Sequence, residues 1–265
     1  MKILYVGDVM GEMGLQLIEK MLPQLKRDKQ IDLVIAQAEN VTQGRGVSRL
    51  DFDRLKRAGV DFCSGGNWSL YLDEINAQMS DPAQPIVRPA NYPAGTPGLG
   101  WKYVSVKGDK VLVVSLLGHI VGKDADKPMD NPLKVIDSIL ESQKDVERAA
   151  TVVNFHGDFS SEKVVIGHYL DGRATLVVGD HWHVPTADAR VLPGGTAHIT
   201  DVGMCGSLDS SLGVMFESVI PRWRDGHATR NVLATSGRTQ FNAVLVETNA
   251  AGLADSIEQI QQIFN

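Results

Sequence analysis

The sequence predicts an α/β fold in a single domain over residues 1–265. Short apolar runs rich in β-branched residues, such as residues 33–36 and 174–178, predict buried strands. Apolar side chains spaced three to four residues apart, as at Val135, Ile136 and Ile139, predict amphipathic helices. A chain of this length can form one large domain or two small ones, and we expect one because no repeat or clear boundary divides it.

The first third of the chain has three strand-like runs, each followed by polar side chains that could bind a metal ion. The runs are residues 3–6, 33–36 and 60–64. The side chains that follow them are Asp8, then Glu39 with Asn40, then Asn67. Carboxylate and amide oxygens are competent metal ligands. Taken alone, Asp8 could equally cap the helix that follows it.

The middle of the chain predicts a long loop followed by a hairpin. Residues 82–100 are dense in proline and glycine, and recognisable elements on both sides indicate a functional loop rather than a linker. Residues 103–106 and 111–117 predict paired strands joined by a tight turn, and His119 follows the second strand.

Two later predicted strands have histidines at or just after their ends. A strand at residues 150–155 ends in His156, and the run at 174–178 leads into Gly179-Asp180-His181-Trp182-His183. Imidazole nitrogen is the commonest side-chain metal ligand, and two histidines one residue apart on a turning backbone can converge on one site. A His-x-His pair alone is weak evidence, because alternating histidines on a strand can point to opposite faces. The other strand-end side chains strengthen the interpretation.

Hydrophobic periodicity assigns the remaining elements. We expect helices at 132–142, 160–169 (capped by Ser160 or Ser161) and 212–219, strands at 196–201 and 239–247, and a last amphipathic helix with Ile257, Ile260 and Ile263 on its apolar side. The other histidines, His168, His198 and His227, have no partner ligands nearby and receive no role.

Composition excludes some classes of partner. A formal net charge of -6 argues against a broad nucleic-acid surface or binding to an anionic membrane. Cys63 and Cys205 form neither a disulfide framework nor a Cys-x-x-Cys pair, which is typical of a reducing compartment. The N-terminus does not resemble a signal sequence, and no apolar run approaches membrane-spanning length. We therefore expect a soluble cytoplasmic protein, and a homo-oligomer is compatible with the sequence.

Together the strand-end side chains predict a metal centre. They are Asp8, Glu39, Asn40, Asn67, His156, His181 and His183. Oxygen and imidazole ligands without thiolate suit manganese, iron or zinc. This set exceeds what one ion needs, so two ions that share a carboxylate are the simplest interpretation. Such a pair activates water and clamps a phosphoryl group, which is the chemistry of phosphate-ester hydrolysis.

The order of these motifs resembles the calcineurin-like dimetal phosphoesterases. It resembles their bacterial YmdB-like branch most closely, which is described as 2',3'-cyclic-nucleotide phosphodiesterases, and the likeness covers almost the whole chain. The motifs are Gly7-Asp8, Glu39-Asn40, Gly66-Asn67, His156 and Gly179-Asp180-His181-Trp182-His183. The resemblance implies a four-layer sandwich of two mixed β-sheets flanked by helices, with two divalent or mixed-valence ions, iron or manganese before zinc, at the strand ends.

Family analogy also implies how the ligands divide between the ions. One ion would be held by Asp8, Glu39, Asn40 and His183, and the other by Glu39, Asn67, His156 and His181, so that Glu39 bridges them. Many relatives in the wider superfamily have a histidine two residues after the first aspartate. This chain has Met10 at that position. The YmdB-like branch also lacks the histidine, so this departure from the wider superfamily supports the closer resemblance.

Trp68 marks the most consequential departure from the family pattern. The family has a histidine here that is thought to protonate the leaving oxygen, and an indole cannot donate that proton. Trp68 either packs over the site or stacks against a nucleobase. His119 could supply the missing proton or contact phosphate if its loop reaches the metals. Smaller departures are His156-Gly157-Asp158 for the usual His-Ala-Glu, and Asp180 and Trp182 for two threonines.

The expected function is therefore a dimetal phosphodiesterase that hydrolyses cyclic nucleotides or related small phosphodiesters by attack of a metal-bound hydroxide, weakened by Trp68. The alternative is a non-catalytic pseudoenzyme that binds a nucleotide or phosphorylated ligand in a regulatory role. A third interpretation is a monoester phosphatase, which needs additional positive groups for the second phosphate charge. Arg45 and Arg88, in loops, are the candidates for those groups.

Overall fold

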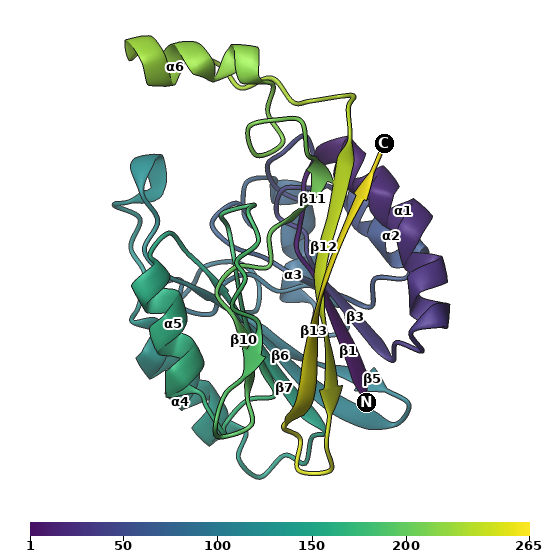
Figure 1. Ribbon diagram of the computed structural model, residues 1–265. Helices are drawn as coiled ribbons and strands as arrows, with labels where there is room; N and C mark the ends of the chain where they lie inside the picture. The colour runs from purple at the N-terminus through teal and green to yellow at the C-terminus, as the bar shows by residue number, and fades with distance from the viewer.

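The computed structural model describes residues 1–265 as two β-sheets packed face to face, with helices on both outer faces (Figure 1). The first sheet runs in the order β2-β11-β12-β1-β3-β4, and β13 also pairs with β12. Its strands are β1 (Lys2–Val6), β2 (Asp8–Val9), β3 (Leu33–Gln37), β4 (Phe62–Ser64), β11 (Met204–Ser207), β12 (Thr239–Thr248) and β13 (Ala254–Phe264). In this sheet β1, β3 and β4 are parallel neighbours.

The second sheet runs in the order β5-β6-β7-β8-β10-β9. Its strands are β5 (Trp101–Val106), β6 (Asp109–Leu117), β7 (Ala150–His156), β8 (Leu176–Asp180), β9 (Arg190–Val191) and β10 (Ala197–Ile199). The four central strands, β6, β7, β8 and β10, are parallel, and the two edge strands are antiparallel to their neighbours. Both sheets are therefore mixed, as predicted.

Helices cover the two outer faces. In Figure 1, α1 (Gly11–Asp28) and α2 (Arg49–Ala58) lie over the first sheet, and α4 (Pro132–Ser142) and α5 (Ser160–Tyr169) lie over the second. Three hydrophobic cores separate the four layers, one between each helix pair and its sheet and one between the sheets. The helices α3 (Asn76–Ser80) and α6 (Ile220–Asp225) are short, and α6 projects from the body of the molecule. No helix is both long and apolar enough to cross a membrane.

The predicted final helix is wrong, because residues 254–264 form the strand β13. Its isoleucines are three residues apart, which matches a helical period but also places successive ones on opposite faces of a strand. Ile260 packs in the core beneath α1 and α2, whereas Ile257 packs against the core between the sheets. Because both faces of this sheet are covered, a strand can bury apolar side chains on either side.

Other predictions were confirmed or corrected locally. The hairpin of β5 and β6 forms as expected. The helix predicted over residues 212–219 does not form, and the helical segment α6 begins at Ile220 instead. Neither Ser160 nor Ser161 caps α5, which begins after Phe159 without a side-chain cap. Asp8 does not cap α1 either, since it lies in β2 and Met10 occupies the capping position.

Candidate metal centre

The predicted ligands lie at or just beyond the carboxyl ends of strands, with Asp8 two residues after β1 at the start of the short β2, and they come from both sheets. The first sheet supplies Asp8 in β2, Glu39 and Asn40 after β3, and Asn67 after β4. The second supplies His156 at the end of β7 and His181 and His183 after β8. His181 is half-buried, and the others are buried. The topology thus brings together side chains that are far apart in the sequence.

Glu39, His156 and His181 form the tightest group. One ligand atom from each lies within 4.8 Å of the other two. His156 Nε2 is 2.9 Å from Glu39 Oε1 and 2.9 Å from Asn67 Oδ1. The ring centroids of His156 and His181 are 4.5 Å apart. Oxygen and nitrogen atoms of four side chains therefore converge.

Asp8, Asn40 and His183 form a second group near the first. Asp8 Oδ1 is 3.7 Å from His183 Nε2. The other ring nitrogen, His183 Nδ1, faces the carbonyl of Leu212 at 3.3 Å. Asn40 Nδ2 donates to the Gly44 carbonyl at 3.0 Å, which leaves its Oδ1 available to a ligand.

The buried polar atoms of this site fit bound cations. Asp8 Oδ1 and Glu39 Oε1 are buried and neither accepts a hydrogen bond, since the 2.9 Å contact of Glu39 with His156 lacks hydrogen-bond geometry. Burial and the nearby Asp180 carboxylate raise the pKa of Asp8 well above its usual value. Burial and His181 lower the pKa of His183 to about 4, so this imidazole is neutral, as coordination requires. A bound cation would offset the negative charge of the buried carboxylates, and it would not have to displace a proton from His183.

Asp180, the last residue of β8, orients His156 from behind. Its Oδ1 lies 2.7 Å from His156 Nδ1, which directs Nε2 of that ring toward the other ligands. Its Oδ2 accepts hydrogen bonds from the Tyr5 hydroxyl and the Asn154 amide. A carboxylate behind a coordinating histidine is a common outer partner in metal sites. Sequence reasoning gave Asp180 no role, and its place directly before His181 was the only available signal.

Asp124 orients Asn67 in a similar way. Asn67 Nδ2 donates to Asp124 Oδ2 at 2.8 Å, so that Asn67 Oδ1 faces His156. Asp124 belongs to the short 3-10 helix Gly122–Asp124, which follows the second sheet's β6. Nothing in the sequence pointed to this residue, because its partner lies 57 positions away.

The loop that carries His181 and His183 has a strained backbone. His181 has φ 105° and His183 has φ 64°, conformations that side-chain-bearing residues rarely adopt. Lys163 Nζ donates to the carbonyl that precedes His181 and to Asp201 Oδ2, each at 2.7 Å. The same Asp201 oxygen accepts the Trp182 N–H at 2.9 Å. A buried ion pair therefore holds the loop in the shape that presents both histidines.

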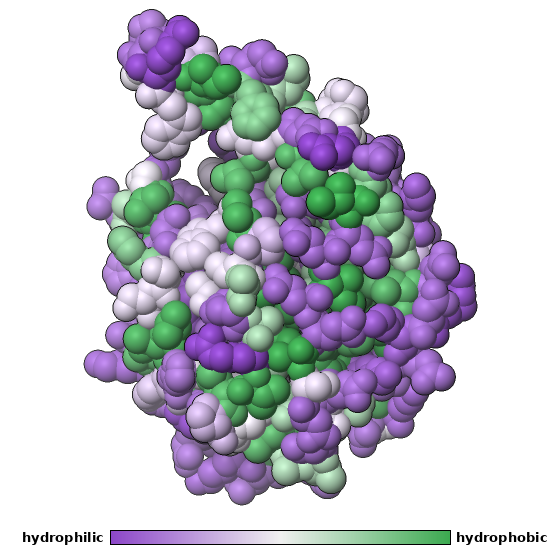
Figure 2. All heavy atoms as spheres, in the orientation of Figure 1, coloured by the Kyte–Doolittle hydropathy of each residue, from purple (hydrophilic) through white to green (hydrophobic).

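A cavity of about 540 Å³ opens beside the ligands. Its lining includes Glu39, His183 and Trp68 on the body and Trp223 on α6. Figure 2 shows the corresponding hollow between the projecting α6 segment and the rest of the molecule. The backbone N–H of Trp68 donates to Glu39 Oε2 at 3.0 Å, so this residue is adjacent to the ligand group.

Two residues considered from the sequence lie outside this cavity. The His119 imidazole pairs with Glu162 and lines a separate cavity beside α4. It does not reach the ligand group, so its interpretation as a substitute proton donor is not supported. Arg88 donates to three backbone carbonyls of the proline-rich loop, which is a structural role. Arg45, by contrast, lines the cavity.

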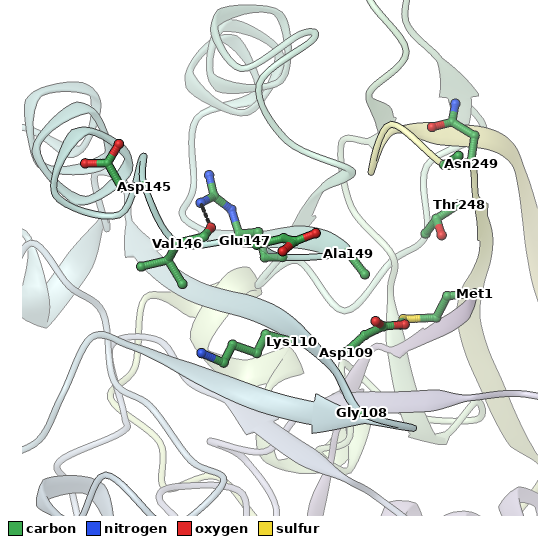
Figure 3. Close-up of a pocket in the computed structure, with 12 residues that line it drawn as sticks. Met1, Gly108, Asp109, Lys110, Asp145, Val146, Glu147, Ala149, Thr248 and Asn249 are labelled. Carbon is green, nitrogen blue, oxygen red and sulfur yellow. Dashed lines mark hydrogen bonds between the residues drawn. The ribbon is translucent and has the colours of Figure 1, made fainter.

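A larger hollow of about 820 Å³ lies at another edge of the sheets (Figure 3). Its lining includes Asp109 at the start of β6 and Ala149 directly before β7. This is the amino end of these parallel strands, whereas His156 ends β7. Sites in open α/β sheets form at the carboxyl ends of strands. The smaller cavity beside the ligands is therefore the candidate active site.

Comparison with known proteins identifies similar chains. The family model for YmdB-like protein matches residues 4–260. The chain is 38% identical over 247 residues to a 2',3'-cyclic-nucleotide 2'-phosphodiesterase of Bacillus subtilis, covering 93% of this chain and 91% of that protein.

Two crystal structures are similar over nearly their whole length. A hypothetical protein from Thermus thermophilus has 37% identity and a TM-score of 0.90, with 99% of each chain covered. A novel phosphatase from Mycoplasma pneumoniae has 30% identity and a TM-score of 0.91, covering 99% of this chain and 93% of that one. The four-layer fold and the sequence matches agree, and the chain belongs to the YmdB-like family.

Proposed function

We propose that this protein is a metal-dependent phosphoric ester hydrolase that cleaves phosphodiesters. The observation that carries the proposal is the convergence of Glu39, Asn67, His156 and His181 beside buried Asp8, with carboxylate oxygens that accept no hydrogen bond. Relatives named as a cyclic-nucleotide phosphodiesterase and as a phosphatase support the same class of reaction. Cyclic nucleotides and related small phosphodiesters are the proposed substrates.

The ligand atoms suit two ions. Glu39, Asn67, His156 and His181 would hold one, and Asp8, Glu39, Asn40 and His183 would hold the other. Iron or manganese fits this oxygen and imidazole set, and zinc also accepts such ligands. A pair of this kind activates water and stabilises charge on a phosphoryl group.

The protein's own side chains limit which leaving groups it can expel. Trp68 lies beside Glu39 but cannot protonate a leaving oxygen, because an indole N–H is not acidic. A general acid typically contributes about 10²- to 10⁴-fold to the rate. Diesters whose leaving group needs little protonation, such as aryl diesters, should therefore be the best substrates.

Trp68 also favours a second candidate function. A protein that has lost the proton donor can keep its metal-built cavity to bind a nucleotide or a phosphorylated ligand in a regulatory role. The retention of every candidate ligand favours the enzyme, since a scaffold has no need to keep carboxylate oxygens buried without a hydrogen-bond donor.

Turnover measurements distinguish the enzyme from the non-catalytic binding protein. We expect the manganese- or iron-loaded protein to hydrolyse an activated aryl diester, and 2',3'-cyclic AMP more slowly, and we expect Glu39→Ala to abolish both activities. Trp68→His should raise turnover of the cyclic nucleotide about 10²-fold or more, because it restores a proton donor. Asp209→Asn, a surface carboxylate paired with Arg238, is the control and should leave turnover unchanged.

The outcome for the parent protein decides the function. An inactive parent together with an active Trp68→His variant would identify a pseudoenzyme with an intact metal site. We also propose that the protein is cytoplasmic and forms a single domain. Its two free, buried cysteines agree with a reducing compartment.

A further inference from the structure

We propose that Arg45, held against the face of Trp68, is the group that binds the substrate's phosphate beside the metal ligands. The inference rests on the proposed function and deepens it. It assigns Trp68 a positioning role in place of the missing proton donor, and it favours phosphodiesters, whose two substituents can occupy two adjacent cavities.

The Arg45 guanidinium faces the candidate active site. Its central carbon lies 4.7 Å from the Trp68 ring centroid, and both residues line the cavity that contains Glu39, His181 and His183. Arginine stacked on an aromatic face keeps its hydrogen-bond donors free at the edge of the stack. Those donors are what a phosphate oxygen needs.

Of the two arginines that line the cavity beside the metal ligands, Arg45 is the one whose guanidinium no protein group binds. Arg222, the other one, donates to Thr229 and Asn231. Arg45 forms neither an ion pair nor a side-chain hydrogen bond, and its contact with Trp68 is the one that places it. An unpaired cation beside a cavity rich in metal ligands is available to an anionic ligand.

The loop that carries Arg45 is fixed by the metal site itself. Gly44 and Gly46 flank it with φ of 79° and 78°, and the Gly44 carbonyl accepts the amide of the ligand Asn40. A Cβ on Gly44 would come within 3.0 Å of Leu233. The hydrogen bond from Asn40 to the Gly44 carbonyl therefore couples the position of Arg45 to that of a proposed metal ligand.

Arg45 also lies at the junction of two cavities. A second cavity of about 270 Å³ shares Met10, Gly44, Arg45, Val214 and Asn231 with the first and continues to Tyr71 and Leu72. A diester has a substituent on each side of its phosphate, and the two cavities can accept one each. Arg45 lies where the phosphate between these two substituents would be placed, and Arg230 lines the second cavity as a further positive charge.

The test compares Arg45→Gln and Arg45→Lys with Arg49→Gln, a matched exposed arginine that also lacks a partner and lines neither cavity. Two quantities are measured on metal-loaded protein of verified metal content: KM for an aryl phosphodiester and Kd for inorganic phosphate by calorimetry. We expect Arg45→Gln to raise both about tenfold or more, as expected for loss of a charged hydrogen bond, with Arg45→Lys in between. Arg49→Gln should match the parent.

A second pair of variants tests the role of Trp68. Trp68→Leu should weaken phosphate binding about threefold because the cation–π contact is lost, and Trp68→Phe should recover part of that loss. Unchanged affinity in Trp68→Leu would overturn the positioning role.

The phosphate titration keeps this inference separate from the proposed function. If the parent has no turnover but Arg45→Gln weakens phosphate binding, the enzyme proposal fails and the phosphate site stands. If the parent is active and Arg45→Gln equals Arg49→Gln in both KM and Kd, the phosphate site is wrong and the enzyme proposal stands.

Discussion

Asp180 determines how His156 can face a metal ion. Its contact with His156 Nδ1 fixes both the orientation of the ring and the nitrogen that carries the proton. We therefore expect Asp180→Asn to reduce metal affinity about 10- to 100-fold, as loss of such an outer partner typically does. Competition with a fluorescent chelator measures the affinity. Asp209→Asn is the control, and equal affinities in the two variants would show that Asp180 does not orient the ligand.

The sequence predicted the candidate ligands, but it did not predict the residues that act through tertiary contacts. The ligand candidates were found because each stands at the end of an apolar strand, and the structure brings them together from both sheets. Asp124 and Lys163 were missed because their contacts are set by tertiary packing between segments distant in the sequence. Arg45 was named from the sequence, but its position beside Trp68 could not be predicted without the loop conformation.

At the scale of elements, the loop after β8 depends on the buried pair of Lys163 and Asp201. Both side chains are fully buried, and their charged atoms are 2.7 Å apart. Lys163→Met should lower the free energy of unfolding by about 3–5 kcal/mol, because it leaves a buried carboxylate without its cation. Adding Asp201→Asn should recover part of that loss. Urea denaturation of the single and double variants measures both effects, and a double variant as unstable as the sum of the single ones would contradict the coupling.

The elements themselves were predicted where the hydrophobic pattern was unambiguous. Strands such as β3 and β7 are buried on both faces and appear as continuous apolar runs. The strand β13 could not be recognised, because three-residue spacing of isoleucines is shared by a helix and by a strand with both faces covered. The pairing of β13 with β12 at ten positions is what makes this segment a strand and not a helix. Such pairing depends on a distant segment and cannot be recognised from the residues of β13 alone.

For the whole molecule, the candidate metal site lies at the junction between the two sheets. Asp8, Glu39 and Asn67 come from the first sheet, and His156 and His181 come from the second. Without a cation, Asp8 and Glu39 bring buried, unpartnered oxygens into this junction. A bound ion would therefore stabilise the packing of one sheet on the other as well as supply the chemistry.

Metal removal should consequently lower the stability of the entire fold. A ligand at about 100 times its Kd stabilises the native state by about 2.7 kcal/mol. For a chain of this size that corresponds to a fall in Tm of about 5–10 °C when a chelator removes the metal. Differential scanning calorimetry with and without chelator measures the shift, and Glu39→Ala should show almost none because it removes the shared ligand. Equal Tm values for the loaded and chelated parent would mean that the ions do not join the sheets, and that the ligands are held in place by packing alone.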